Sequence, residues 1–229
     1  MHIFPNLNEY HRQAWLQETI SKLSDGSRIL DVGAGQLKNK ALCTKLNYVS
    51  QDFCQYTPIN AVGGLHTNEW NTNYIDIVSD LLEIPEPDSS FDAILCTEVL
   101  EHVPEPNLAL VEFARLLKPG GILILTAPFS SNVHMAPYHF YTGFTKFWYT
   151  FNLSKNNFFV KELTPNGDWY DLLMQELSRL GGLERKNRNW TWPLAYMYSM
   201  LGRLYFSIRF KHKAEDLACF GWNCIGIKK

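Results

Sequence analysis

The chain has 229 residues and a net charge of −2, with 46% hydrophobic and 19% charged residues. This composition is ordinary for a globular protein and excludes extended disorder. A chain of this length fits one generous domain, so we expect a single core. Because basic charge is not in excess, we expect no attraction to nucleic-acid phosphates and no nucleic-acid partner.

The cysteines and the apolar runs bear on the compartment. The five cysteines are odd in number and form no Cys-x-x-Cys pair, so the sequence indicates neither a disulfide framework nor a zinc site. No run of about 18 uncharged apolar residues occurs, and the first residues do not resemble a signal peptide. We therefore expect a cytoplasmic protein without integral membrane association.

Hydrophobic periodicity predicts the elements in chain order. A leading helix is expected over 6–24, and Asp25 and Gly26 end it. Short apolar runs then alternate with helical patterns near 36–46 and 107–117. The predicted strands are Arg28–Val32, Asn47–Gln51, Tyr74–Ser79, Phe91–Thr97 and Gly121–Thr126. Strands that are apolar on both faces and alternate with helices are typical of a parallel sheet, so the predicted fold class is doubly wound α/β.

Beyond Thr126 the pattern is looser. A loop rich in Pro, His and Tyr is followed by further elements, and residues 183–213 form an aromatic, partly basic stretch that we interpret as an insertion. The remaining predictions are a loop over 127–142, a helix near 144–154, a strand near 157–163, a helix near 168–180 and a terminal strand at Cys219–Ile227. We expect one domain over 1–229, with a ligand-binding core at 28–128 and a substrate-side lid and insertion at 129–213.

A glycine turn follows the first predicted strand. Residues 31–35 read DVGAG, which places Gly33 and Gly35 where a buried strand turns into the next element. Glycine tolerates positive φ and lets a ligand approach the backbone, so the turn indicates a nucleotide cofactor; the alternative is a plain tight turn. Lys38 stands where the dinucleotide fingerprint has its third glycine, which disfavours NAD.

Two acidic residues accompany the turn. Asp31 precedes the first glycine and either accepts hydrogen bonds from a ligand ammonium through water or only ties down the loop. Asp52 follows Gly35 by 17 positions, at the end of the second predicted strand. A carboxylate there can accept both hydroxyls of a ribose, whereas the alternative is a solvated loop aspartate.

Five segments in this order resemble the class I S-adenosylmethionine-dependent methyltransferases, in particular the small bacterial type that acts on metabolites, lipids or sugars. They are residues 29–35, 80–85, 88–95, 96–103 and 116–126. The resemblance implies a Rossmann-like, mostly parallel seven-stranded sheet with an antiparallel terminal strand. It implies S-adenosyl-L-methionine as the cofactor. Leu37 departs from the family, because many members have a third glycine there.

The resemblance also implies roles for single residues. Gly33 and Gly35 would face the methionine part of the cofactor, and Asp52 would bind its ribose. Asp80 and the Leu81 backbone would pair with the adenine edge, because a carboxylate accepts from the exocyclic amine and an N–H donates to a ring nitrogen. Two further residues at the end of the fourth predicted strand would lie near the sulfonium, Thr97 and Glu98.

The substrate side is expected in the loop over 128–144, which resembles a loop that caps the active site in methyltransferases of glycan and cell-envelope biosynthesis. His134 and His139 are candidates for a general base toward a hydroxyl nucleophile, or they only pack the lid. His102 we interpret as a structural histidine. The acceptor is expected to be a small molecule or glycan, with oxygen as the first choice, and no metal is expected because no residues have ligand spacing.

Two other functions stay open: a noncatalytic S-adenosylmethionine-binding protein and a nicotinamide-dependent oxidoreductase.

The role of the aromatic stretch at 190–210 is also open, because a helix there would have almost no polar face. Large apolar patches are rarely exposed on monomers, so we expect a lid or a homodimer element there rather than a membrane anchor.

Overall fold

The computed structural model describes residues 6–56, 71–209 and 217–229. These residues divide into two compact units. The first, here called the helical unit, takes its residues from 1–14 and 165–220. The second, called the sheet unit, takes its residues from 15–164 and 221–229.

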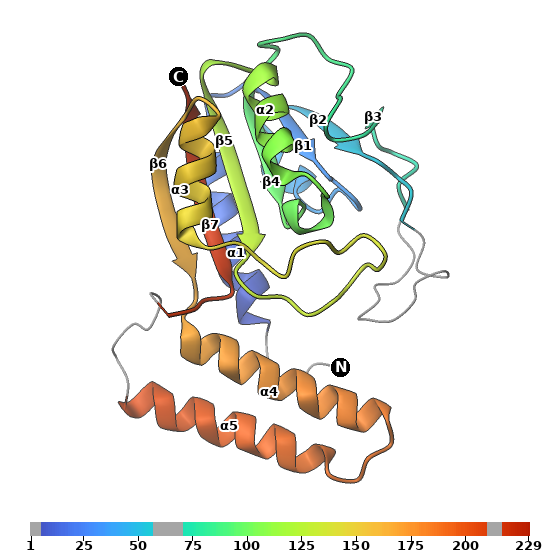
Figure 1. The fold of residues 1–229 in the computed structure, drawn as a ribbon, viewed down its shortest axis with the longest axis vertical. Helices are drawn as coiled ribbons and strands as arrows, with labels where there is room; N and C mark the ends of the chain where they lie inside the picture. Colours follow the sequence, from blue (N-terminus) through green and yellow to red (C-terminus); the bar gives the residue numbers. More distant parts are fainter. Residues whose placement is uncertain (1–5, 57–70, 210–216) are drawn as a thin grey trace. The chain divides into compact units, whose positions relative to one another are not determined.

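A seven-stranded sheet forms the centre of the sheet unit, in the order β3-β2-β1-β4-β5-β7-β6 (Figure 1). The pairs along β3-β2-β1-β4-β5 are parallel, whereas β7 runs antiparallel to β5. The predicted fold class and the antiparallel terminal strand are therefore confirmed. The strands are β1 Arg28–Val32, β2 Asn47–Asp52, β3 Ile77–Val78, β4 Phe91–Thr97, β5 Leu117–Pro128, β6 Phe158–Asn166 and β7 Gly221–Lys228.

Helices cover both faces of this sheet. Figure 1 shows α2 (Pro106–Leu116) and α3 (Lys146–Lys155) on one face and α1 (Leu7–Ser21) on the other. On the α1 face, Leu16 and Ile20 pack in one fully buried cluster with side chains from β1, β4 and β5. Successive residues of a strand point to opposite faces, so the continuous apolar runs of β1 and β4 supply both cores.

The helix predicted near 36–46 is wrong. The structure has only a short 3₁₀ helix, η1, at Lys40–Cys43, and the turn before it contains Leu37 with a φ of +58°. The backbone there forms hydrogen bonds between residues three apart, such as the one from the Lys40 N–H to the Leu37 carbonyl at 3.1 Å. A left-handed residue cannot continue an α-helix, and the apolar spacing does not reveal it.

The third predicted strand, Tyr74–Ser79, is present only as the two residues of β3. The Asp76 carboxylate accepts from both the Ser50 N–H, at 2.9 Å, and the Ser50 hydroxyl, at 2.7 Å. A side chain therefore occupies the position at which a backbone carbonyl would extend the ladder, and pairing with β2 begins only at Ile77.

The helical unit contains α4 (Trp169–Lys186) and α5 (Trp192–Arg209), which lie side by side in Figure 1. Asp168 caps α4, and the Ser178 and Ser199 hydroxyls are hydrogen-bonded across the two helices at 2.7 Å. The stretch interpreted as an insertion is thus the end of α4 together with α5. Among the described residues, no helix is long and apolar enough to span a membrane.

Candidate functional site

A pocket of about 370 Å³ opens at the carboxyl ends of the central strands of the sheet unit. The chain runs outward from β1 to β3 and then returns to β4, so the pocket lies at the switch point where ligands bind in open α/β sheets. A volume of this size is in the range of small-molecule and cofactor sites. The lining residues that the argument uses are Gly33, Asp52, Asp80, Leu81, Glu98 and His102.

The glycine turn forms one wall of this pocket. Gly33 has a φ of +65°, and a Cβ on it would lie 2.5 Å from Cγ2 of Val99. Its N–H donates to the Gln51 side chain at 3.4 Å, and the Gly35 N–H donates to the Asp52 carboxylate at 2.9 Å. The turn after β1 is therefore tied to the end of β2 by two side chains.

Asp52 is buried, with 3% of its surface exposed, and it lines the pocket. Besides the Gly35 N–H, it accepts from the Cys54 N–H at 2.8 Å through its second oxygen. A carboxylate oxygen has more than one acceptor position, so both oxygens can still accept from a ligand hydroxyl. The position predicted for ribose binding is thus at the pocket wall, and backbone donors fix its orientation.

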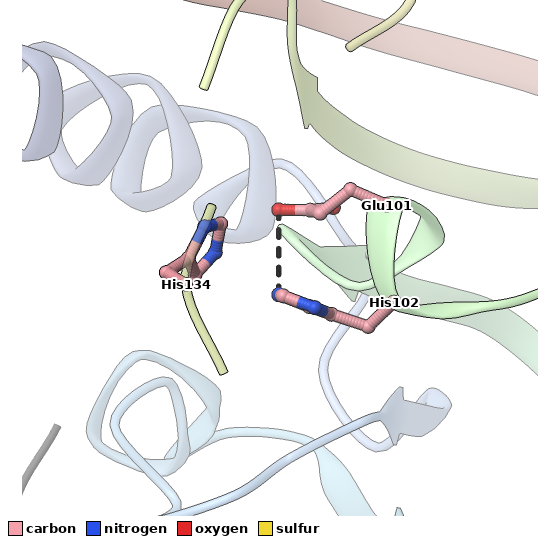
Figure 2. A group of neighbouring side chains, drawn as sticks. All are labelled: Glu101, His102 and His134. Carbon is pink, nitrogen blue, oxygen red and sulfur yellow. Dashed lines mark ion pairs between the residues drawn. The ribbon is translucent and has the colours of Figure 1, made fainter. Parts of the chain in front are cut away.

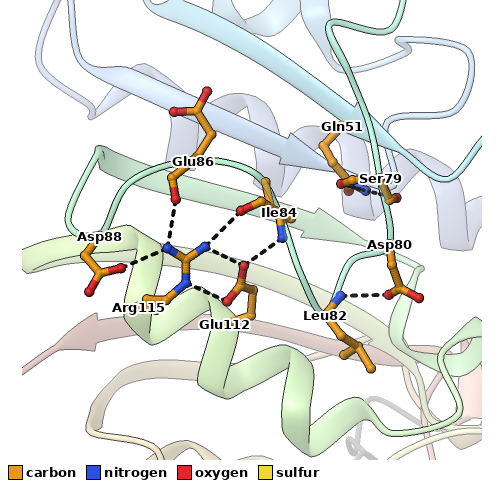
Figure 3. Close-up of polar contacts among 9 residues, drawn as sticks. All are labelled: Gln51, Ser79, Asp80, Leu82, Ile84, Glu86, Asp88, Glu112 and Arg115. Atoms are coloured by element: carbon orange, nitrogen blue, oxygen red, sulfur yellow. Dashed lines mark hydrogen bonds and ion pairs between the residues drawn. The ribbon is translucent and has the colours of Figure 1, made fainter.

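Asp80 and Leu81 lie on the same wall. The exposed Asp80 carboxylate accepts from the Leu82 N–H at 2.8 Å, which closes a tight turn in which Leu81 is buried. The Gln51 side chain donates to the Ser79 carbonyl at 2.8 Å, as Figure 3 shows. Gln51 therefore joins the glycine turn to the segment that precedes Asp80.

An arginine holds the far end of this segment (Figure 3). Arg115 of α2 donates to the carbonyls of Ile84 and Glu86 at 2.9 and 2.8 Å. It also donates to both carboxylate oxygens of Glu112 at 2.8 and 2.7 Å, while Glu112 accepts the Ile84 N–H at 2.8 Å. The guanidinium thus binds two carbonyls and a buried carboxylate at once, which fixes the loop over 79–88.

Asp31 belongs to the end of β1, two residues before Gly33, and is not part of the described pocket lining. It is 1% exposed, and one oxygen accepts from the Tyr48 hydroxyl at 2.7 Å. The other oxygen, Oδ1, is also buried, and a hydrogen bond from the Asn39 side chain favours the ionised form of the carboxyl. Burial is the main cause that raises the pKa of Asp31 to about 7.

The two residues predicted to lie near the sulfonium are placed differently. Glu98 lines the pocket with a φ of +54°, and its carboxylate accepts from the Thr126 hydroxyl at 2.9 Å. Thr97 is absent from the described lining, and its hydroxyl accepts from the Asn39 amide at 3.2 Å. Of the two, the structure brings only Glu98 to the pocket.

The loop after β5 closes one side of the pocket. Met135, Tyr138 and Phe140 line it, and the Tyr138 ring meets Phe53 edge to face at 5.0 Å. The Phe140 N–H donates to the Glu101 carbonyl at 2.9 Å, which ties the loop to the segment after β4. The aromatic residues of this loop therefore contribute to the wall of the pocket.

The histidines gather where this loop meets the segment after β4. His102 is largely buried and lines the pocket. The ring centroids of His134 and His139 lie 4.7 and 5.9 Å from that of His102. Burial lowers the pKa of His102 to about 4, so its imidazole is neutral at pH 7. Neither loop histidine belongs to the described lining, and His102 holds the position at the pocket instead.

Several lining residues were not predicted. Gln51 and Phe53 flank Asp52 at the end of β2. Because they are neighbours of a predicted ligand residue, the sequence could have identified them as lining residues. Val99 and Val103 follow the β4 end in the same way. Met135, Tyr138 and Phe140 have no such signal, because a loop without periodicity does not show which side chains turn inward.

Residues 30–125 match the family described as a methyltransferase domain. This match covers the glycine turn, Asp52 and Asp80. It also covers β2 to β4 and most of β1 and β5. Less than half of the chain, residues 30–125, is thus similar to a methyltransferase domain. The match ends before the loop that carries His134 and His139.

Methyltransferases are also among the similar proteins of known sequence or structure. The ubiquinone biosynthesis O-methyltransferase of Xylella fastidiosa is 39% identical over 105 residues, which are 44% of this chain and 42% of that protein. The chain thus matches less than half the length of this curated relative.

Two solved structures show the same fold. A SAM-dependent methyltransferase from Archaeoglobus fulgidus has a TM-score of 0.58 at 15% identity, covering 96% of this chain and 94% of that one. The cyclase SpnF has a TM-score of 0.59 at 18% identity, covering 95% and 80%. A cyclase among the neighbours means that the fold alone does not determine the reaction.

Proposed function

We propose that the chain transfers a methyl group from S-adenosylmethionine to an oxygen of a small-molecule or glycan acceptor. The observation that carries this proposal is the pocket at the switch point, where Gly33 lies beside two carboxylates of Asp52 and Asp80. The O-methyltransferase relatives support oxygen as the acceptor atom. The nicotinamide alternative lacks the third glycine, because Lys38 stands in its place.

The residues of the pocket fit this cofactor. Asp52 would accept from the ribose hydroxyls, and Asp80 with the Leu81 backbone would pair with the adenine edge. The buried Asp31 carboxyl belongs to the end of β1, directly before the turn where the methionine part would bind. The turn has no room for a side chain at Gly33, because a Cβ there would lie 2.5 Å from Cγ2 of the lining residue Val99.

When bound, S-adenosylmethionine would supply the methyl carbon: the acceptor oxygen would bond to it in line as its bond to sulfur breaks, S-adenosylhomocysteine would leave, and the hydroxyl proton would pass to a base or to water. The protein's part is to align the acceptor and to exclude water, effects worth up to about 7–11 kcal/mol in model systems. Val99, Met135 and Phe140 give the pocket an apolar rim for that purpose. We propose that His134 and His139 act on the acceptor side and that Thr97 and Gly35 support the turn.

The cofactor is tested by calorimetric titration with S-adenosylhomocysteine and, in parallel, with NADH. We expect binding of the first and none of the second. Transfer is then tested with a radiolabelled methyl donor against phenols, catechols and glycans. Binding of S-adenosylhomocysteine without transfer to any acceptor favours the noncatalytic alternative, and binding of NADH alone overturns the proposal.

Asp52→Ala is expected to weaken S-adenosylhomocysteine binding by at least tenfold, because the ribose loses charge-assisted hydrogen bonds worth about 1.5–3 kcal/mol. The variant also releases the N–H groups of Gly35 and Cys54, so thermal unfolding is measured alongside calorimetry. Asp25→Ala is the control, since that carboxylate is 74% exposed and pairs only loosely with Lys45 at 3.8 Å. Equal affinity in both variants would remove Asp52 from the site.

The pKa of Asp31 predicts a pH dependence of binding. Because this pKa is raised to about 7, the side chain is largely protonated at pH 6 and ionised at pH 8. A ligand ammonium favours the ionised form, so the affinity for S-adenosylhomocysteine should rise between pH 6 and 8. Asp31→Asn should flatten this profile. An unchanged profile would assign Asp31 to tying down the loop.

The same pKa predicts the stability of the unliganded protein. A carboxyl with a raised pKa keeps its proton when the unfolded chain has lost it, so stability declines as the pH rises from about 4 to about 7. Asp31→Asn should remove this part of the decline in urea unfolding.

The loop histidines are tested on turnover once an acceptor is found. His134→Ala and His139→Ala should lower kcat much more than the affinity for S-adenosylhomocysteine, because a group that acts on the acceptor contributes in the transition state. Full turnover in both variants would make them packing residues.

We also propose a cytoplasmic location for the protein and a lid or homodimer role for residues 190–210. All five cysteines are free, which supports a cytoplasmic location. Along α5, the side chains of Leu194, Met197 and Leu204 are exposed. We keep the interpretation of residues 190–210 as a lid or homodimer element as a prediction, to be tested by sedimentation.

A further inference from the structure

Three side chains converge beside the pocket. Glu101 and His102 belong to the short 3₁₀ helix η3 (Leu100–His102) after β4, and His134 comes from the loop after β5. One ligand atom from each lies within 4.8 Å of the others, and Figure 2 shows the three side chains turned toward one another. Glu101 is 1% exposed, whereas His102 and His134 are partly exposed, so a buried carboxylate meets two imidazoles that solvent can reach.

The hydrogen bonds of the two histidines determine which nitrogen can bind a cation. Nδ1 of His102 faces the Tyr138 carbonyl, and Nδ1 of His134 lies 2.9 Å from the Asn132 carbonyl. A carbonyl only accepts, so Nδ1 carries the proton in both rings and Nε2 carries the lone pair. Histidines that ligate metals are oriented by this type of backbone contact.

Glu101 and His102 lie within ion-pair distance but are not hydrogen-bonded to each other (Figure 2). Nε2 of His102 and Oε1 of Glu101 are 3.8 Å apart, which is too far for a hydrogen bond. Ligands about 2.0–2.2 Å from a tetrahedral zinc ion lie roughly 3.4 Å from one another. The three ligand atoms lie within 4.8 Å of one another, so binding needs a contraction of about 1.4 Å or less, which we expect the loop that carries His134 to supply.

We propose that Glu101, His102 and His134 bind a divalent transition-metal ion, with Zn²⁺ as the reference ion. Two imidazoles with one carboxylate are a ligand set found in catalytic zinc sites, where a fourth position stays open. The spacing along the chain does not reveal this set, because an adjacent Glu-His pair and a histidine on a later loop match no ligand motif. The fold brings them together, contrary to the expectation of no metal.

The position beside the pocket gives the ion a role. His102 lines the pocket, so the open position would face an acceptor hydroxyl, whose pKa a bound metal lowers. His134 would then act through the metal rather than as a base, which leaves His139 as the second histidine of the acceptor side. This role rests on the proposed function, whereas metal binding itself does not.

The test uses the full chain after removal of metal by a chelator. Zn²⁺ is titrated in a calorimeter, and Co²⁺ is titrated with absorption spectra that report a low-symmetry site. We expect one ion per chain, and a loss of affinity of about 100-fold or more in His134→Ala and Glu101→Gln, since each removes a ligand. His139→Ala is the matched control on the same loop and should stay within about threefold of the parent chain.

S-adenosylhomocysteine binding is measured on each sample, which separates failure of this inference from failure of the proposed function. An adventitious surface site would bind zinc equally in the parent chain and in His134→Ala, and this result would overturn the inference. So would an equal loss in His139→Ala, or no binding by the parent chain. Because Glu101 is buried, His134→Ala decides the case if Glu101→Gln does not fold.

Discussion

Gly33→Ala is expected to lower the affinity for S-adenosylhomocysteine by at least about 100-fold, which corresponds to about 2.7 kcal/mol. The added Cβ would lie 2.5 Å from Cγ2 and 2.9 Å from Cγ1 of Val99, and the backbone there has a φ of +65°. Overpacking and a left-handed non-glycine residue each cost about 1–3 kcal/mol. Because Gly33 and Val99 both line the pocket, relief of the clash must change the pocket wall. Calorimetry should therefore show lost binding, and chemical unfolding should show a lowered stability.

Gly26→Ala is the control for backbone conformation. Gly26 has a similar φ of +78°, but a Cβ there would meet nothing within 4 Å. This variant should lose only about 1 kcal/mol of stability and keep its affinity. If Gly33→Ala also binds with parent affinity, the glycine turn does not form the ligand wall.

Arg115→Met is expected to lower the free energy of unfolding by about 3 kcal/mol, the range for removing one partner of a buried pair. The change leaves the Glu112 carboxylate without its cation and frees the carbonyls of Ile84 and Glu86. Because the side chain of Arg115 is itself 32% exposed, we do not expect the upper end of that range. The loss is measured by urea unfolding at pH 7.

Lys118→Met removes a cation from a comparable ion pair that is more exposed, since Lys118 and Asp92 are 47% and 37% exposed. We expect this control variant to lose less than about 1 kcal/mol in its free energy of unfolding.

Arg115→Met should also weaken S-adenosylhomocysteine binding, since the loop that begins at Ser79 presents Asp80 to the pocket. Equal stability of the two variants would show that Arg115 does not hold this loop.

The sheet and its ligand wall were largely predictable from local patterns. β1 and β4 begin and end where the apolar runs do, because strands buried on both faces need continuous hydrophobic residues. Gly33 and Asp52 were recognisable because the end of a parallel strand is the place where such a fold binds ligands. These features depend on neighbours in the chain, which a sequence shows directly.

Features that depend on distant side chains were not predictable. Arg115 reads as an ordinary polar residue of a helix, and only the fold places Ile84 and Glu86 against it. Leu37 occupies a left-handed conformation that its residue type does not indicate. His102 was interpreted as structural, and its hydrogen bond to the Tyr138 carbonyl fits that view, but its place in the pocket wall depends on how the later loop folds back.

The strand order has a consequence for biosynthesis. β7 lies between β5 and β6, although it follows β6 by more than 50 residues in the chain. A nascent chain that has reached only residue 216 therefore exposes an unpaired edge of β5, whose last residues are wholly buried in the finished sheet. Such edges attract other strands, so the interval before β7 emerges is the stage of synthesis at which a chaperone is most needed.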